Sequence, residues 1–411
     1  MKSSLIILAI LISSMSSVYA SGDPVLRENI YYQFQKQILN INAKSVRLNG
    51  FTHFEQALYV DALWDLTEEG SPEAIATLNE VVPVYYNLLE KLRLGILRLK
   101  YKRSANLSDE LVTELMNALR EPNSDVKIIY TLAAYEKEIM AAGHTDLIEQ
   151  AKLDNRYQDV SEDSELKKEF TNDMLTDIFY NTPDVTTYMN GEYIKSVKIF
   201  MFCRSNRLFP CLMTMKNAQG EIVRNADGSI WTQRALASSK QGLPSYSRNG
   251  NTPAGIHFID SVMPSADQNV SFGKFRRMIL NFVPKSKNEI LHLALLPESS
   301  KNKDWWKPAT VARDIGRNDL RIHGTGKVNE EPTTPYFPFM RTNGCISQRE
   351  NTYEGIVYRD QRELLDSIMT AMDLAAVYEN ELKIKGILYL IEVDGTNEPM
   401  TLKVLNDKGI E

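Results

Sequence analysis

The sequence predicts an α+β protein with two domains of different kinds. From residue 21 to about residue 150, apolar residues recur at three- and four-residue spacing, which is the period of amphipathic helices. After Ser196 this period gives way to short apolar runs separated by turns, which is typical of strands. We therefore expect an all-helical domain at 21–150, a polar and acidic linker at 151–194, a β-rich domain at 195–395 and a C-terminal tail at 396–411.

The first 20 residues have the pattern of a secretory signal peptide. Lys2 precedes an apolar run at residues 5–12, and a stretch of small residues ends in Val18-Tyr19-Ala20. A membrane anchor is the alternative, but the run is too short for it, because a spanning helix needs about 20 apolar residues. We therefore expect cleavage after Ala20, no membrane span in the mature chain, and export to the periplasm or cell wall.

Charge and motif content exclude several classes of partner. The 411 residues include 47 Lys and Arg and 53 Asp and Glu, which gives a net charge of −6, and no basic block interrupts this balance. Nucleic acid is not an expected partner, because its binding relies on clustered positive charge. The sequence has no His, Cys and Asp cluster with metal-ligand spacing and no glycine-rich phosphate loop, so no metal or other cofactor is expected.

Small polar residues mark helix starts in the N-terminal domain. Ser71 precedes Pro72, Ser108 precedes Asp109, and residues 123–125 read Asn-Ser-Asp. Two of these stretches resemble each other, as in HEAT-like helical repeats, although a plain bundle is the simpler interpretation. No catalytic motif occurs here, so the role of this domain stays open; positioning of a protein partner or of the substrate is the interpretation that remains.

Apolar runs in the C-terminal domain predict strands. They cover residues 197–202, 211–215, 278–282, 290–295 and 386–391. A helix is expected over residues 360–381, where apolar residues return to helical spacing.

Two of the three cysteines flank a predicted turn between strands. Cys203 and Cys211 form either a disulfide across this hairpin or two buried thiols, and both interpretations are open. Cys345 stands apart from them in either case.

Two short motifs carry the chemistry. His323-Gly324-Thr325 is followed by Thr342-Asn343-Gly344-Cys345-Ile346. A cysteine nucleophile needs a base because a thiol is mostly protonated at neutral pH, and a histidine from another strand can supply it. Glycine before the cysteine lets the backbone approach a substrate carbonyl, where the N–H groups of Gly344 and Cys345 can stabilise an oxyanion. A buried inert thiol is the alternative.

These motifs resemble the signature of the L,D-transpeptidase catalytic domain, also called the YkuD-like domain. Residues 251–258 include Thr252-Pro253-Ala254-Gly255, which resembles the Thr-Pro-x-Gly segment of that family and precedes the histidine in the same order. The resemblance covers residues 195–395 only. It implies a β-rich catalytic domain and a cysteine acyl-enzyme formed on peptidoglycan tetrapeptide stems, which an amine of another stem converts into a 3→3 cross-link.

The resemblance also implies roles for individual residues. Cys345 matches the nucleophile and His323 matches its base, while the backbone around Gly324 orients the imidazole. Thr342 and Gly344 shape the nucleophile loop.

Further residues are candidates for substrate binding. Asn343 stands where many members have His, and Ser347 stands where many have Arg or Asn; Arg341 or Arg349 can substitute for the missing group. Arg321 shares a strand face with the histidine two residues later, so it either binds a substrate carboxylate or forms a structural ion pair.

Two segments near the motifs have alternative interpretations. Residues 330–338 form either a lid over the site or a surface loop. Trp305 and Trp306 form either a platform for glycan stacking or part of the core.

The expected function is therefore peptidoglycan L,D-transpeptidation, with a role in cell wall synthesis and cell shape. An L,D-carboxypeptidase or related hydrolase would use the same Cys-His site with water as the acceptor. A wall-binding scaffold with weak activity, acting through the helical domain, is a third interpretation.

Overall fold

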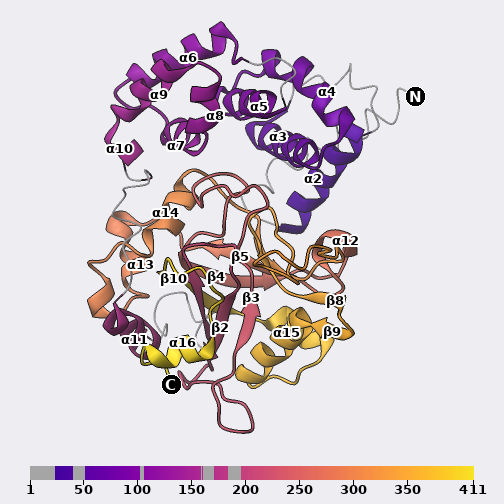
Figure 1. The fold of residues 1–411 in the computed structure, drawn as a ribbon, viewed down its shortest axis with the longest axis vertical. Helices are drawn as coiled ribbons and strands as arrows, with labels where there is room; N and C mark the ends of the chain where they lie inside the picture. Colours follow the sequence, from indigo (N-terminus) through magenta and orange to yellow (C-terminus); the bar gives the residue numbers. More distant parts are fainter. Residues whose placement is uncertain (1–23, 40–50, 102–105, 159, 161–170, 184–195) are drawn as a thin grey trace. The chain divides into compact units, whose positions relative to one another are not determined.

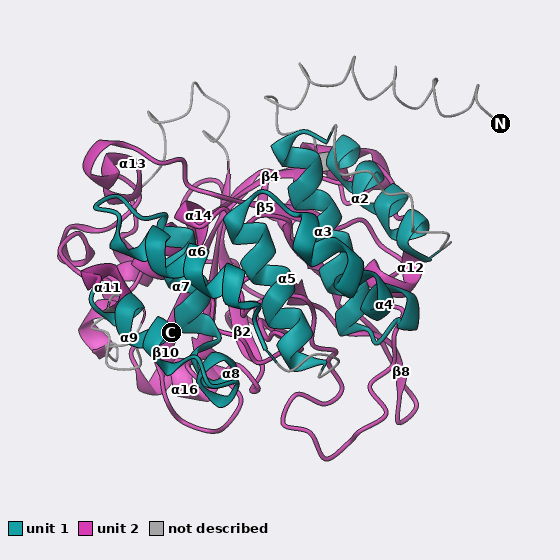
Figure 2. Cartoon of the chain, turned by 90° about the horizontal axis from the view of Figure 1, so that it is seen from above, with its two compact units in different colours: residues 1–153 teal, residues 154–411 magenta. Residues whose placement is uncertain are grey.

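The chain folds into two compact units, residues 1–153 and 154–411 (Figure 2). The computed structural model describes residues 24–39, 51–101, 106–158, 160, 171–183 and 196–411. The predicted signal peptide lies outside the described residues. None of the described helices is long and apolar enough to cross a membrane.

The first unit is helical, as predicted (Figure 1). Its described elements are α2 (Pro24–Leu39), α3 (His53–Glu68), α4 (Pro72–Val81), the 3-10 turn η3 (Val82–Val84), α5 (Leu88–Lys100), α6 (Asp109–Arg120), α7 (Val126–Ala134), α8 (Glu136–Ala141) and α9 (Thr145–Lys152).

The helix starts predicted from small polar residues are confirmed. The hydroxyls of Ser71 and Ser108 each accept a hydrogen bond from the third backbone N–H of α4 and α6. At the third start, the Asp125 carboxylate accepts the backbone N–H of Lys127 in α7. Each cap gives a partner to an amide that has none inside its helix, which stabilises a helix by about 1 kcal/mol.

Helix α3 is central to the packing of this unit. It contacts α2, α4 and α5 and buries Leu63 and Trp64. Charge is also buried here: Arg93 of α5 forms ion pairs of 2.8 Å with both Asp61 and Glu90. The charge of Arg93 is therefore compensated by two buried carboxylates.

The second unit is built on a mixed sheet (Figure 1). Its strands are β1 (Val197–Arg204), β2 (Cys211–Lys216), β3 (Gln233–Ala235), β4 (Gly255–Val262), β5 (Met278–Phe282), β6 (Leu320–His323), β7 (Ile346–Ser347) and β10 (Gly386–Asp394). Their spatial order is β3-β2-β1-β10-β4-β5-β6-β7. Neighbouring strands are antiparallel except for β1 with β10 and β6 with β7. A separate hairpin pairs β8 (Glu350–Tyr353) with β9 (Ile356–Arg359).

Further helices and turns make up the rest of the second unit. They are α10 (Asn155–Gln158), α11 (Asn172–Asn181), α12 (Asn269–Phe272), η5 (Lys287–Glu289), α13 (Ile290–Leu293), η6 (Glu298–Ser300), α14 (Lys307–Asp314), α15 (Asp360–Ala371), η7 (Tyr378–Lys383) and α16 (Leu402–Asp407). The described structure thus has a helical N-terminal region and a sheet-rich C-terminal region, which fits the predicted α+β class.

Strand β1 shows why the central strands are apolar throughout. Successive side chains of a strand point to opposite faces of the sheet. Ile199 and Met201 join a core that includes α15, while Phe200 and Phe202 join a second core that includes α11 and α16. Figure 1 shows these helices on the two sides of the sheet. Both faces are therefore covered, which requires a continuous apolar run.

The two ends of the strand order meet beside the predicted nucleophile. Leu236, which follows β3, and Ser347 of β7 exchange backbone hydrogen bonds of 3.0 and 2.8 Å. A second bridge joins Ser239 to Thr342. The sheet therefore nearly closes on itself, and the segment around Cys345 is held on both sides.

Two predicted elements of the C-terminal domain are corrected. Residues 290–295, predicted as a strand, contain α13 instead, because Asn288 and Glu289 take left-handed φ values of 53° and 52° and turn the chain into a helix. The helix predicted over 360–381 ends with α15 at Ala371, and η7 follows as a separate 3-10 turn.

The predicted linker and tail both contribute to the core. Residues 151–194 were expected to connect the domains, but α11 lies within them and buries Ile178 and Phe179 against the sheet. Residues 396–411 were expected to be a tail, but α16 buries Leu405 in the same core. Short apolar faces whose partners are distant in sequence account for both differences.

Of the two interpretations for Cys203 and Cys211, the structure shows the disulfide. Cys203 and Cys211 form a disulfide across the β1–β2 connection, with Cα atoms 4.3 Å apart. Cys345 is therefore the one free thiol among the three cysteines of the chain.

Candidate active site

Strands β6 and β7 bring the two sequence motifs together. The strands are parallel, with His323 opposite Ser347 and Ile322 opposite Ile346. Because both isoleucines join the core with α15, His323 faces the other side of the sheet. Continuing the register by one residue puts Cys345 on this same side, on the neighbouring strand about 4.8 Å away.

The turn before β7 is fixed by side chains and backbone. The Thr342 hydroxyl donates to the Cys345 carbonyl (2.7 Å) and accepts the Gly344 N–H (3.2 Å). The Thr252 hydroxyl donates to the Gly344 carbonyl at 2.8 Å. The Thr-Pro segment, the histidine strand and the cysteine turn, which are far apart in sequence, thus converge at this point.

Glycine is required at position 344 for two reasons. Its φ of 102° lies in the left-handed region that residues with a Cβ rarely adopt. A Cβ there would also collide with the Gly250 carbonyl oxygen and with Nη2 of Arg317. Two backbone N–H groups, those of Gly344 and Cys345, were expected to stabilise an oxyanion. The Gly344 N–H already donates to Thr342, whereas the Cys345 N–H makes no hydrogen bond within the described residues and stays available for this role.

The thiol is buried, and burial favours its protonated form. The exposed fraction of Cys345 is 7%, and its Sγ donates to the Asp319 carbonyl at 3.6 Å. Burial raises the pKa of Cys345; the guanidinium and backbone N–H of Arg321, together with Arg317, oppose this rise, while Asp319 adds to it. Within the described chain the thiol makes no hydrogen bond to His323, so it must rotate away from Asp319 to reach the imidazole.

The imidazole is held as a neutral base. Nδ1 of His323 donates to the carbonyl of Gly324, which leaves the lone pair on Nε2. Burial lowers the pKa of His323 to about 3, and Arg321 and Arg277 also lower it. A neutral imidazole facing a neutral thiol is the starting arrangement for general-base catalysis.

A buried carboxyl group sits against the His-Gly motif. Oε2 of Glu350 accepts the Lys274 N–H at 2.8 Å, and the carboxyl group occupies the space that a Cβ would need at both Gly324 and Gly273. Oε1 is buried and makes no hydrogen bond in the described chain. Burial raises the pKa of Glu350 to about 7, so this carboxyl is partly protonated at neutral pH. Gly324 is thus fixed by packing as well as by its bond to the imidazole.

Phe272 of α12 covers the imidazole. Its ring meets the His323 ring edge-on, with centroids 4.9 Å apart. The same ring lies 4.4 Å from the Arg277 guanidinium and 5.3 Å from that of Arg321. A substrate that reaches the imidazole from this side must therefore displace α12 or pass beside it.

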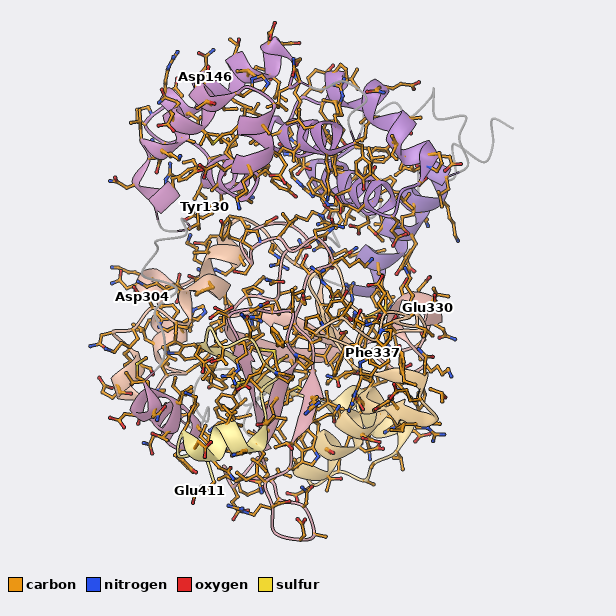
Figure 3. The ribbon with its side chains drawn as sticks, in the orientation of Figure 1. Tyr130, Asp146, Asp304, Glu330, Phe337 and Glu411 are labelled. Atoms are coloured by element: carbon orange, nitrogen blue, oxygen red, sulfur yellow. A yellow bond between two sulfur atoms is a disulfide. The ribbon has the colours of Figure 1, made fainter. Side chains whose placement is uncertain are left out.

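Residues 330–338, which were expected to form either a lid or a surface loop, are anchored to the β8–β9 hairpin. The Asn329 N–H donates to the Tyr353 hydroxyl at 3.0 Å, and the ring of Phe337 packs edge-on against Tyr353 with centroids 5.5 Å apart. Figure 3 shows Glu330 at the outer edge of this unit and Phe337 further in. These contacts tie the segment to the hairpin and give it no bond to the thiol or imidazole.

One candidate for substrate binding, Ser347, already has a hydrogen-bond partner within the fold. Ser347 is fully buried and donates its hydroxyl to the Met340 carbonyl at 2.7 Å, so it has a structural role in β7. The substitute proposed for it, Arg349, forms a 2.7 Å ion pair with Asp360.

Other candidates lie closer to the site. Arg321 donates to the Asp319 carbonyl at 2.7 Å and lies 3.7 Å from its carboxylate, so it forms the structural ion pair that was one of its two interpretations. Arg341 donates to the Ser239 carbonyl. Asn343 is half-buried beside the nucleophile.

The tryptophan pair belongs to the core. Trp305 and Trp306 are 6% and 4% exposed and pack in the core with α11 and α16. The glycan platform is therefore excluded in favour of packing. Among the residues that the structure describes, no group of three or more His, Cys, Asp or Glu side chains has the arrangement of a metal site.

Several residues of the site were not singled out from the sequence. Arg317, Asp319, Phe272 and Glu350 surround the Cys-His pair but belong to no motif. Only their proximity in the fold identifies them. No family model, curated protein or solved structure matches the chain.

Proposed function

We propose that this protein is an exported cysteine acyltransferase that acts on peptidoglycan, with the activity of an L,D-transpeptidase. Cys345 is the nucleophile and His323 is the base. The observation that supports this most strongly is the convergence of three separated motifs, through the Thr252–Gly344 hydrogen bond and the parallel pairing of β6 with β7.

The first half of the reaction forms a thioester. The thiol turns from Asp319 toward His323, whose Nε2 takes the proton as sulfur attacks the carbonyl that follows the L-centre of a tetrapeptide stem. The Cys345 N–H stabilises the developing oxyanion. The S–C bond forms, the C–N bond to the terminal D-residue breaks, and the imidazolium returns the proton to the leaving amine.

The second half regenerates the thiol. An amine of another stem attacks the thioester carbonyl and gives a proton to the neutral imidazole. The new C–N bond forms, the S–C bond breaks, and the proton passes to the departing thiolate. A nearly dry site favours this order, because both side chains are neutral before each attack and charge develops only during it.

The test is product analysis of purified tetrapeptide muropeptides incubated with the full-length protein and with Cys345→Ala. Mass spectrometry should detect dimers with a 3→3 link only with the unsubstituted protein. Loss of the terminal D-residue without dimers would replace transpeptidation by the hydrolytic reaction at the same site. Unchanged muropeptides with a folded protein would contradict the proposal.

A further inference from the structure

Arg317 is a half-buried cation beside the turn that carries Cys345. Its Nη1 donates to the carbonyls of Ser245 and Asn251, the latter at 2.7 Å, and its Nη2 donates to the Gly250 carbonyl at 2.9 Å. These acceptors are uncharged. Among the described residues no carboxylate forms an ion pair with it, so carbonyl dipoles alone compensate the half-buried charge, which costs more free energy than pairing with a counter-ion.

The guanidinium also touches the turn that carries the thiol. Nη2 lies where a Cβ of Gly344 would be, and the Gly250 carbonyl that Nη2 holds lies against the same glycine. One planar fork therefore fixes residues 245–251 and presents its charge to the residue before Cys345. Arg321, the other cation beside the thiol, is partly compensated by Asp319.

We propose that Arg317 is a positioning residue that stabilises the Cys345 thiolate and holds the nucleophile turn against residues 245–251. This deepens the proposed function, because it supplies the charge that a neutral Cys-His pair needs once sulfur becomes an anion. The uncompensated cation then finds its counter-ion only during the reaction.

The charged groups around the pair are few. Arg317, Arg321 and Asp319 face the thiol, and Arg248 faces Arg317. His323 lies on the neighbouring strand, where Arg277 acts on its imidazole and the Glu350 carboxyl packs against Gly324. Burial lowers the pKa of Arg317 to about 9, while an ionised Cys345 opposes this change. This reciprocal effect agrees with the geometry: each group favours the charged form of the other.

The test measures the reactivity of the single free thiol without any peptidoglycan. The rate of iodoacetamide alkylation of Cys345 is followed from pH 6 to pH 11 in the full-length protein, in Arg317→Gln and in Arg317→Lys. Glutamine keeps two donors for the carbonyls but removes the charge. We expect its profile to shift upward by about one pH unit, so that alkylation near pH 7.5 slows about tenfold, because loss of a nearby opposite charge disfavours the thiolate.

Lysine should restore most of the rate, within about threefold of the unsubstituted protein. The control is Arg204→Met, since Arg204 is a fully buried arginine of the same unit that pairs with Asp394 instead. It should leave the alkylation profile in place even if it lowers the thermal stability.

A folded Arg317→Gln whose profile superimposes on that of the unsubstituted protein would overturn the proposal. If this variant does not fold, the lysine variant decides, because a tenfold slower thiol with the charge retained would contradict a role for that charge. Alkylation of Cys345 needs no acyl donor, so the two proposals can fail independently. An unchanged alkylation profile would overturn the role of Arg317 and leave the transpeptidase proposal standing. Absence of muropeptide conversion would contradict the transpeptidase proposal and leave the role of Arg317 standing.

Discussion

Arg93 in the helical unit and Arg317 in the sheet unit are both half-buried, but their partners differ. Arg93 bonds two carboxylates, Asp61 and Glu90. Burial alone would disfavour its charge, yet these two carboxylates outweigh burial and raise its pKa. Arg317 bonds only backbone carbonyls, and burial lowers its pKa to about 9.

Elsewhere in the sheet unit, buried charge follows the pattern of the helical unit. The buried arginines 204, 207 and 276 each have a carboxylate partner. Near Cys345, three groups without a counter-charge or full hydrogen bonding lie close together: Arg317 without a carboxylate partner among the described residues, a neutral histidine, and the carboxyl of Glu350 with an unbonded oxygen. Because such groups are costly for stability, their proximity to the thiol favours a functional site there.

Loss of the proposed base, His323, should have the largest effect of all the predicted changes, and the affected quantity is the rate of muropeptide conversion. His323→Gln removes the lone pair that accepts the thiol proton but retains a donor for the Gly324 carbonyl. We expect the initial rate of muropeptide conversion to fall by about 10²–10⁴-fold, the usual contribution of a general base. A loss of less than about tenfold in a folded variant would assign the base role elsewhere.

Breaking compensated charge in the helical unit should affect stability and leave the thiol unchanged. Arg93→Met leaves Asp61 and Glu90 buried without their cation, and we expect the free energy of unfolding to fall by about 3–5 kcal/mol. Scanning calorimetry measures this change. Lys152→Met in the same unit removes a partly exposed pair with Glu136 and should cost no more than about 1 kcal/mol.

Equal costs for the two substitutions would show that the Arg93 ion pairs do not stabilise the helical core. An altered alkylation profile of Cys345 in Arg93→Met would contradict the separation between structural and functional charge.

A methyl group on Gly324 tests the packing of Glu350. Gly324→Ala drives a Cβ into the Glu350 carboxyl group, so we expect a loss of about 1–3 kcal/mol in stability together with slower muropeptide conversion. Adding Glu350→Ala to the Gly324→Ala chain should restore part of the stability and part of the rate of muropeptide conversion, since both losses arise from the contact between the new Cβ and the Glu350 carboxyl. Gly395→Ala, where no atom lies within 4 Å of the new Cβ, is the matched control.

The smallest expected effect is a change in how stability depends on pH. Burial lowers the pKa of His257 and of His292 to about 4, and that of His323 to about 3. Below the unfolded value of about 6.5 the unfolded chain binds protons that the folded chain does not, so stability is full above pH 6.5 and falls on acidification toward pH 4. Glu350 contributes in the opposite sense, since its raised pKa makes the folded chain bind a proton between about pH 4.5 and 7.

Substitution of one histidine isolates its contribution to the pH dependence of the free energy of unfolding. His257→Gln should make the curve of unfolding free energy against pH shallower by at most about 1.4 kcal/mol per pH unit between pH 4.5 and 6. Denaturant unfolding at a series of pH values measures the slope. An unchanged slope would mean that His257 is protonated equally in the folded and unfolded chain.

Periodicity in the sequence predicted the helical first unit, the sheet-rich second unit and four strands of its sheet. The runs that became β1, β2, β5 and β10 are continuous and apolar because each strand is buried on both faces. The run at 290–295 has a similar composition but folds as α13, because the left-handed backbone at Asn288 and Glu289 is set by the surrounding structure. Helices α11 and α16 were missed for a related reason: their partner surface is a sheet formed by residues distant in sequence.

The site was predictable only where a motif carried it. Cys345, His323 and Thr252 belong to short patterns, and the structure brings them together. Arg317 and Glu350 have no such signal, since an arginine and a glutamate in a charged chain are ordinary until the fold buries them. Their importance depends on partners that become neighbours only through tertiary contacts.

The most direct test of the central claim is the intact mass of the protein after brief incubation with a tetrapeptide donor and no acceptor. The account predicts an adduct on Cys345 equal to the donor without its terminal D-residue, absent in Cys345→Ala. Such an adduct is common to transfer and hydrolysis, so it tests the shared chemistry. A folded protein that releases the D-residue without this adduct, or that carries it in Cys345→Ala, would contradict the account.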